Sequence, residues 1–308
     1  MSGGEPCTIS TALAVDQRDP TSSGWEIFSW THLPQELQVK ILEHLRRSDL
    51  DKCQLLNRNT FELIRCNKRW MKRRLIDHLM IAKNGYYELM GRGLSLHIQS
   101  DEERVFKVWE VWPSYSISCR LEKLLKNADV HYLEIIKVLQ SNDLVESILS
   151  DLLNADSRIQ KLAIMDTSMA GVTSSMLLRF LRHTDPTKII FSGISDCSRD
   201  NFSPEVLQHI VTRQEFFLST LQSDPIPIDD DILAQLTATH FYIGAPNLLT
   251  INGLKSFVER LAAGKRMVTR GTIFTNFFLD GVSFPTSPNI YLELVVEGTG
   301  LEISTKVS

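Results

Sequence analysis

Apolar residues recur at helical intervals between residues 33 and 70 of the 308-residue chain. One stripe repeats every four residues and consists of Leu33, Leu37, Ile41 and Leu45. Pro34 fits the first turn of this helix, because the N–H that proline lacks has no partner at that position. Asp49 suits the start of another helix, since its carboxylate accepts hydrogen bonds from the free N–H groups there. The pattern predicts two or three short helices in this segment.

A different pattern begins near residue 130, where short apolar runs alternate with amphipathic segments. The runs predict strands and the amphipathic segments predict helices. The expected strand–helix pairs are 131–138 with 142–153, 159–165 with 172–183, 188–191 with 203–211, 215–221 with 230–236, and 240–243 with 252–263. Strands are expected to start near residues 131, 159, 187, 215, 239 and 267, which lie 24 to 28 residues apart.

A period of this length, with one strand and one helix per unit, resembles a leucine-rich-repeat-like solenoid, in which neighbouring units stack strand on strand. The consensus is only partly present: Leu133-x-Ile135 fits Leu-x-Leu, whereas the asparagine turn is missing. A compact α/β domain with the same order of elements is the alternative. Two more strands are expected at 272–278 and 289–296, and the glycines at 298 and 300 predict an antiparallel hairpin that covers the last edge of the sheet.

The stretch before this alternation carries weaker signals. Residues 79–129 are expected to form a mostly helical connector, interrupted by a short strand at 94–98. One helical face in this connector, ending before Pro113, is expected to consist of Val105, Val108, Trp109 and Trp112. At the other end of the chain, residues 1–24 are small, polar and rich in chain breakers, and they predict a disordered leader.

The helical segment at 33–70 is too small to bury a sufficient core alone, and no cysteine or histidine spacing supplies a disulfide or a metal. Its residues also follow a characteristic order, which is Leu33-Pro34-x-Glu36-Leu37, Ile41-Leu42, Asp49-Leu50, Leu55-Leu56 and a late Trp70. This order resembles the F-box. Two positions depart from the family pattern: Cys53 stands where the family usually has leucine, and Thr60 where an aromatic residue is common, with Phe61 as its replacement. An ordinary helical hairpin in an all-α domain is the alternative.

The F-box resemblance implies that residues 25–78 dock on the Skp-type adaptor of a cullin–RING (SCF) ubiquitin ligase, and through the adaptor on a cullin. A module with too small a core is expected to complete it on this partner. The expected adaptor-binding residues are Leu33, Pro34, Leu37, Ile41, Leu42, Leu50 and Leu55. Some of them must face the core of the module itself, and the sequence does not separate the two groups.

The C-terminal region loosely resembles the FTH-type and F-box-associated domains of the large nematode F-box family. The resemblance rests on the order of the modules and on three short stretches, Leu124-Leu125-Lys126 before Leu133-Glu134-Ile135, and Leu254-Lys255-Ser256-Phe257 before Gly264-Lys265-Arg266. It implies that residues 130–308 bind an unknown target protein. The fold class expected for the whole chain is α+β and multi-domain: a small all-α F-box module, then an α/β leucine-rich-repeat-like domain with a C-terminal antiparallel hairpin.

Charge and composition narrow the class of partner. The net charge is −4, but residues 33–78 hold 11 Lys and Arg against 6 Asp and Glu, or +5, which leaves −4 − 5 = −9 on the rest. A weakly basic module on an acidic body is not typical of nucleic-acid binding. We expect no membrane partner either, because the chain has no apolar run of about 18 residues. Scattered cysteines and a start that lacks a secretion signal favour a cytoplasmic or nuclear location.

Candidate chemistry is sparse along the chain. The eight histidines form no His-x-x-x-His or His-Glu-x-x-His pair, and neither a nucleophile elbow nor a phosphate-binding loop is present. Asp229-Asp230-Asp231 is interpreted as the start of a helix at Ile232 and not as a metal site. The prediction is therefore a protein without catalytic, cofactor-binding or metal-binding residues: a non-catalytic ligase subunit, or alternatively a scaffold that binds the adaptor without delivering a target.

Overall fold

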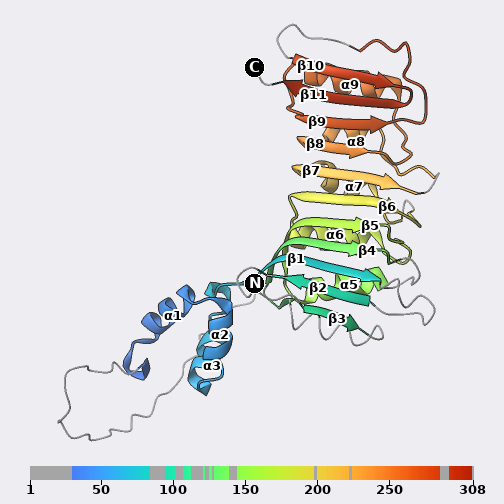
Figure 1. Ribbon diagram of the computed structural model, residues 1–308. Helices are drawn as coiled ribbons and strands as arrows, with labels where there is room; N and C mark the ends of the chain where they lie inside the picture. Colours follow the sequence, from blue (N-terminus) through green and yellow to red (C-terminus); the bar gives the residue numbers. More distant parts are fainter. Residues whose placement is uncertain are drawn as a thin grey trace, which may run out of the picture. The chain divides into compact units, whose positions relative to one another are not determined.

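The computed structural model describes residues 30–83, 94–100, 107–111, 121, 125–126, 128–138, 144–197, 200–221, 224–284 and 291–306. The chain divides into two compact units, Met1–Arg74 and Leu75–Ser308, which we call the helical unit and the sheet unit (Figure 1). The boundary lies shortly before residue 78, where the sequence placed the end of the helical module. The expected leader, residues 1–24, lies outside the described residues.

The helical unit contains the short helices that the apolar spacing predicts. They are η1 (Trp30–His32), α1 (Gln35–His44), α2 (Arg47–Cys53), α3 (Arg58–Cys66) and η2 (Lys68–Trp70). Pro34 is the N-cap residue of α1 instead of a member of its first turn, and its carbonyl accepts the N–H groups of Leu37 and Gln38. Asp49 lies in the first turn of α2. Asn57 begins α3, since its side chain accepts the N–H of Thr60 at 2.8 Å.

A small apolar core holds the helical unit together. Its buried residues are Leu42, Leu50, Leu63, Ile64 and Met71. Cys53 and Trp30 pack against this core, so the cysteine occupies a position that also suits a leucine. Thr60 is buried, whereas the neighbouring Phe61 is exposed. Whether Phe61 replaces the aromatic residue of the family pattern stays a prediction, since its side chain is 41% exposed and lies outside the core of the unit.

The sheet unit is built on one eleven-stranded sheet. The strands are β1 (Arg74–Lys83), β2 (Leu94–Gln99), β3 (Lys107–Val111), β4 (Ala128–Ile136), β5 (Arg158–Met165), β6 (Lys188–Ile194), β7 (Glu215–Thr220), β8 (His240–Ile243), β9 (Arg270–Phe274), β10 (Tyr291–Glu297) and β11 (Gly300–Lys306). Their order across the sheet is β10-β11-β9-β8-β7-β6-β5-β4-β1-β2-β3. The strands from β4 to β9 are parallel and follow the order of the sequence.

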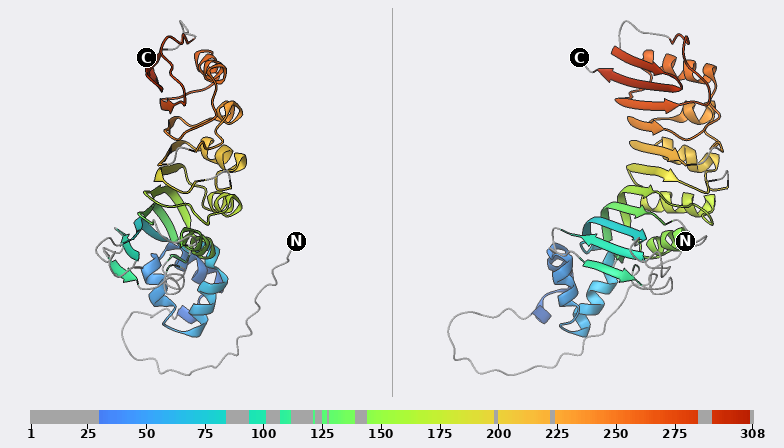
Figure 2. Two further views of the ribbon diagram at one scale, coloured as in Figure 1. Left: turned by 90° about the vertical axis from the view of Figure 1, so that its right-hand side faces the viewer. Right: turned by 45° about the vertical axis from the view of Figure 1, so that its right-hand side comes forward.

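Each step between these parallel strands passes through a helix. The helices are α5 (Leu144–Asn154), α6 (Ser174–Thr184), α7 (Pro204–Val211), α8 (Asp230–Gln235) and α9 (Ile251–Ala262). All five lie on one face of the sheet (Figure 2). The predicted strand–helix alternation is confirmed, and β4 to β9 start at residues 128, 158, 188, 215, 240 and 270, each within three residues of the predicted start. The mixed α/β class of this region is thus established.

The local signals that start and end these helices act as expected. Ser203 accepts the N–H of Val206 and Pro204 occupies the first turn of α7. Asp229 accepts the N–H of Ile232 at 2.9 Å, which confirms the interpretation of the aspartate run as a helix start. Gly264 follows α9 with a φ of 69°, a left-handed conformation that favours glycine.

The two ends of the sheet differ in how well the sequence predicted them. The predicted C-terminal hairpin is confirmed: β10 and β11 pair antiparallel around Gly298, and β11 pairs antiparallel with β9. At the other end, the strand expected at 94–98 is confirmed as β2, whereas the otherwise helical connector at 79–129 is wrong over its described part, because β1 and β3 are strands that pair antiparallel with β2. The expected helical face through Val108 and Trp109 lies in β3, while Val105, Trp112 and Pro113 lie outside the described residues.

Candidate functional site

The helical unit exposes more large apolar side chains than it buries in its core. Among its described residues, six large apolar side chains are exposed, and we call them the apolar surface set: Leu37, Ile41, Leu55, Leu56, Phe61 and Trp70. The buried core of the same unit consists of only five side chains. Because contiguous exposed apolar surface is typical of protein–protein contact sites, these side chains are the candidates for such a site in this unit.

Two members of the apolar surface set lie together on helix α1. Leu37 and Ile41 are four residues apart and lie on one face of the helix, where they are 47% and 44% exposed. The adjacent Leu42 points the other way, into the core. The Gln38 side chain fixes the start of the helix, since its amide donates to the carbonyls of Trp30 at 3.1 Å and Leu33 at 2.8 Å.

The seven predicted adaptor-binding residues separate into three groups. Pro34, Leu37, Ile41 and Leu55 are exposed, and Leu33 is half-buried. Leu42 and Leu50 are 1% and 0% exposed and belong to the core, so they are the members of the set that face the interior of the unit, as was expected of some of the seven. The reason is geometric: α1 and α2 each need an inward-facing leucine to pack against α3, and apolar spacing alone does not tell the inner stripe from the outer one.

Three exposed residues were absent from the predicted site. Leu56 is 73% exposed beside Leu55 in the turn between α2 and α3, and Phe61 and Trp70 are exposed farther along. The sequence carried one usable signal, the pair Leu55-Leu56, because two adjacent apolar residues in a turn seldom both face inward. Phe61 gave no such signal, since it lies within the apolar spacing of α3.

Three basic residues at the end of α3 and after it contact groups of the same unit. Arg65 pairs with Glu62 at 2.7 Å, and Lys72 donates to the carbonyl of His44 at 3.2 Å. Arg74 pairs with Asp51 at 3.1 Å, which ties α2 to the segment after η2. Lys72 and Arg74 therefore connect separate segments of the unit, and the apolar surface set remains its candidate contact site.

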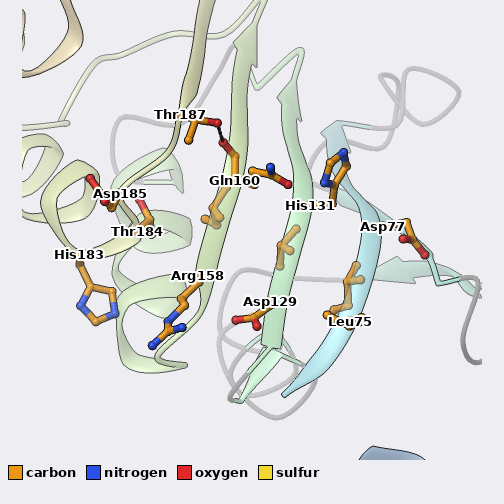
Figure 3. A pocket seen from close by; sticks show the side chains of 13 residues that line it. Leu75, Asp77, Asp129, His131, Arg158, Gln160, His183, Thr184, Asp185 and Thr187 are labelled. Atoms are coloured by element: carbon orange, nitrogen blue, oxygen red, sulfur yellow. Dashed lines mark hydrogen bonds between the residues drawn. The ribbon is translucent and has the colours of Figure 1, made fainter. Parts of the chain in front are cut away.

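The sheet unit contains a cavity of about 610 Å³ at the amino ends of β1, β4 and β5 (Figure 3). Asp77 lies on one side of it, with Arg158 and His183 on the other. Its polar groups mainly serve the fold: His183 lies 3.6 Å from Asp156, Asp185 pairs with Arg213, and the Thr187 hydroxyl donates to a backbone carbonyl at 3.0 Å. The described side chains around this cavity do not place a nucleophile beside a base.

Two groups with raised pKa values lie elsewhere in the sheet unit. Burial, and then the carboxylate of Asp196, raise the pKa of the Cys197 thiol to about 12, so this thiol stays protonated at neutral pH. Burial, followed by the hydrogen bond to Glu134, raises the pKa of the Tyr132 hydroxyl. Glu134 also bonds His78 at 2.8 Å, and the His78 ring stacks on Tyr132. Neither arrangement provides an activated nucleophile.

The described residues contain neither a metal-binding cluster nor a helix that could span a membrane. Over the described ranges, no three His, Cys, Asp or Glu side chains come together in a way that could hold a metal ion. No helix in the part of the chain that the structure describes is long and apolar enough to cross a membrane. Comparisons with protein-family models, with curated proteins and with solved structures found no match to this chain.

Proposed function

We propose that this chain is an F-box protein that serves as the substrate-recognition subunit of an SCF ubiquitin ligase. In this proposal the helical unit docks on the Skp-type adaptor, and the sheet unit, a leucine-rich-repeat-like domain, binds a target protein. The supporting observation is that Leu37 and Ile41, both within the F-box-like residue order, are exposed on one face of α1 beside a very small core.

The proposed mechanism is positional. The chain supplies no reacting group; it holds a lysine of the target near a ubiquitin-charged enzyme and so raises the effective concentration of that lysine. This requires two binding surfaces in one chain. The division into two compact units is consistent with that requirement, because each unit has a hydrophobic core of its own.

The adaptor-binding surface is tested by removing its central side chains. Leu37→Ala with Ile41→Ala is expected to weaken binding of the full chain to a Skp-type adaptor by at least about 100-fold, because buried anchor residues dominate interface energies. The measurement is calorimetric titration of adaptor into each variant. Leu221→Ala with Met267→Ala is the control, since it removes two exposed apolar side chains from the sheet unit.

If the variant with Leu37→Ala and Ile41→Ala binds the adaptor with wild-type affinity, the assignment of the docking surface to this face of α1 is wrong. A reconstituted ligase then separates the two functional alternatives. Ubiquitin transfer to a protein held by the sheet unit supports the recognition role, whereas adaptor binding without transfer to any captured protein would indicate a scaffold that sequesters the adaptor.

A further inference from the structure

The face of the sheet that α5–α9 leave open carries a row of charged side chains. The strand register sets this row, which runs from β5 to β9 through Lys161, Lys188, Glu215, His240 and Arg270. The alternate residues, such as Ile189 and Phe216, are buried on the side of the helices. We call these five residues the charged row.

The charged row has a positive excess. Lys188 pairs with Glu215 at 2.9 Å, and this contact, with smaller effects of His240 and Lys161, holds the pKa of Glu215 below its usual value. The side chains of Lys161 and Arg270 form no hydrogen bond or ion pair with the described residues. The charged row contains three cations and one carboxylate, so its net charge is +2 when His240 is neutral. The residues outside 33–78 carry a net charge of −9, so the row differs in sign from the rest of this region.

A second row, two residues farther along each strand, is apolar and aromatic except for a threonine at its end. It consists of Ala163, Ile190, Phe217, Tyr242 and Thr272. The rings of Phe217 and Tyr242 stack with centroids 4.2 Å apart, and Phe274 lies 5.7 Å from Tyr242. A Cβ on Gly244 would lie 2.4 Å from the Tyr242 ring, so this glycine leaves the space in which the tyrosine lies along the sheet. The result is a half-buried aromatic platform beside the charged row.

The charged row ends at a hollow next to the C-terminal hairpin. This cavity has a volume of about 330 Å³, and its polar lining consists of Arg270 and Thr272 of β9, Glu293 of β10, and Glu302 and Ser304 of β11. An unpaired cation, an aromatic platform and a hollow are therefore adjacent on the open face.

We infer that this open face binds an acidic, extended peptide segment of the target protein. Carboxylates of the segment pair with Lys161 and Arg270, and its apolar side chains lie on Phe217 and Tyr242. Neighbouring strands lie about 4.8 Å apart, so the path from β5 to β9 is about 19 Å long and spans about six residues of extended chain. This inference rests on the proposed role of the sheet unit as the part that binds a target.

The charge distribution favours a peptide over a nucleic acid. Glu215 interrupts the charged row, and Glu134 and Glu302 flank the second row at either end. A continuous phosphate backbone would meet these carboxylates, whereas a peptide can place a neutral residue opposite each of them. Specific spacing of the acidic residues is therefore expected to matter.

The test uses the full chain and a fluorescein-labelled peptide of alternating aspartate and phenylalanine, followed by fluorescence anisotropy. Lys161→Glu with Arg270→Glu is expected to weaken binding about tenfold or more, and Phe217→Ala with Tyr242→Ala about tenfold. Raising the salt from about 0.05 M to about 0.5 M should weaken binding of the wild-type chain several-fold. Circular dichroism and the thermal midpoint of each variant establish that it is folded.

One control makes the same change in charge at a different place on the protein, and another reverses the charge of the peptide. Arg179→Glu with Lys265→Glu reverses two exposed cations outside the open face and should leave binding unchanged. A peptide with lysine in place of aspartate should not bind. Equal binding of the lysine peptide, unchanged binding by the folded Lys161 and Arg270 variant, or displacement of the peptide by oligothymidine would each overturn the inference.

Adaptor binding, measured on the same variants, separates a failure of this inference from a failure of the proposed function. The open-face variants leave the residues of α1–α3 unchanged, so they should retain wild-type affinity for the adaptor. Loss of peptide binding with intact adaptor binding supports the inference, and an absence of peptide binding by the wild-type chain overturns it without touching the adaptor site. Failure of the wild-type chain to bind the adaptor counts against the proposed function alone.

Discussion

Gly271 in β9 lies directly against the ring of Phe241 on the neighbouring strand β8. A Cβ at this position would approach the Phe241 ring to 2.2 Å, so Gly271→Ala forces the ring or the strand to move. We expect the free energy of unfolding to fall by about 1–3 kcal/mol, which is typical of overpacking in a well-packed core. Urea denaturation of the full chain measures the change.

A second substitution checks that this clash is the cause. Phe241→Leu shortens the opposing side chain, so Gly271→Ala should cost less in that background than in the wild type. Equal costs in both backgrounds would show that the ring is not what excludes a side chain at Gly271.

His209 on α7 gives the sheet unit a pH-dependent contribution to stability. Burial, and then the charge of Arg213, hold the pKa of His209 below its usual 6.5. The unfolded chain therefore takes up a proton at His209 more readily than the folded chain does, and this contribution is complete above pH 6.5 and is lost as the pH falls through the lowered pKa.

The difference between wild type and His209→Gln isolates this effect from other groups. We expect wild-type stability to decline more steeply than that of the variant as the pH is lowered from about 7 to about 5. Glu215, whose pKa is also lowered, contributes stability that is lost only at more acidic pH. Parallel pH profiles for the two proteins would contradict the assignment to His209.

At the scale of elements, the periodic signals were reliable where one face of each element is buried. The starts of β4 to β9 could be predicted from the sequence because apolar residues alternate in each strand. The helices between them could be placed because Ser203 and Asp229 mark helix starts and Gly264 marks a helix end. The strand β3 could not, because an apolar spacing around Val108 and Trp109 fits a helix locally, and pairing with β2 decides the outcome.

The candidate site shows the same limit. The sequence identified the helical segment that carries Leu37 and Ile41, but it could not separate them from Leu42 and Leu50, since burial depends on where α3 packs. Buried asparagines were also missed. Asn201 and Asn247 lie in the loops after β6 and β8 at different distances from the strand ends, so no fixed spacing revealed them.

Asn247 connects the loop after β8 to the following strand. Its side-chain amide donates to the carbonyls of Ala245 at 3.0 Å and Phe274 at 2.7 Å, and the residue is 3% exposed. Asn247→Ala leaves these carbonyls without that donor, and we expect it to lower the free energy of unfolding by about 1–3 kcal/mol. Asn252→Ala, at an exposed position of α9, is the matched control and should change stability by less than about 0.5 kcal/mol in either direction.

At the scale of the whole molecule, the two units differ greatly in the size of their cores. Five buried apolar side chains hold the helical unit, whereas one extended core runs through the described part of the sheet unit from β1 to β11. A small core gives little cooperative stability, so the helical unit should open more often than the sheet unit. Hydrogen exchange monitored by mass spectrometry should therefore show faster exchange in α1–α3 than in β4–β9.

Adaptor binding should change this pattern in one unit only. Partner contacts with Leu37 and Ile41 stabilise the folded helical unit by mass action, so exchange in α1–α3 should slow by at least about tenfold at saturating adaptor, while exchange in β4–β9 stays unchanged. The Leu37→Ala with Ile41→Ala variant should lose this protection. If α1–α3 are already as protected as β4–β9 without the adaptor, the core of the helical unit is sufficient by itself, and its exposed apolar side chains need an explanation other than completion by a partner.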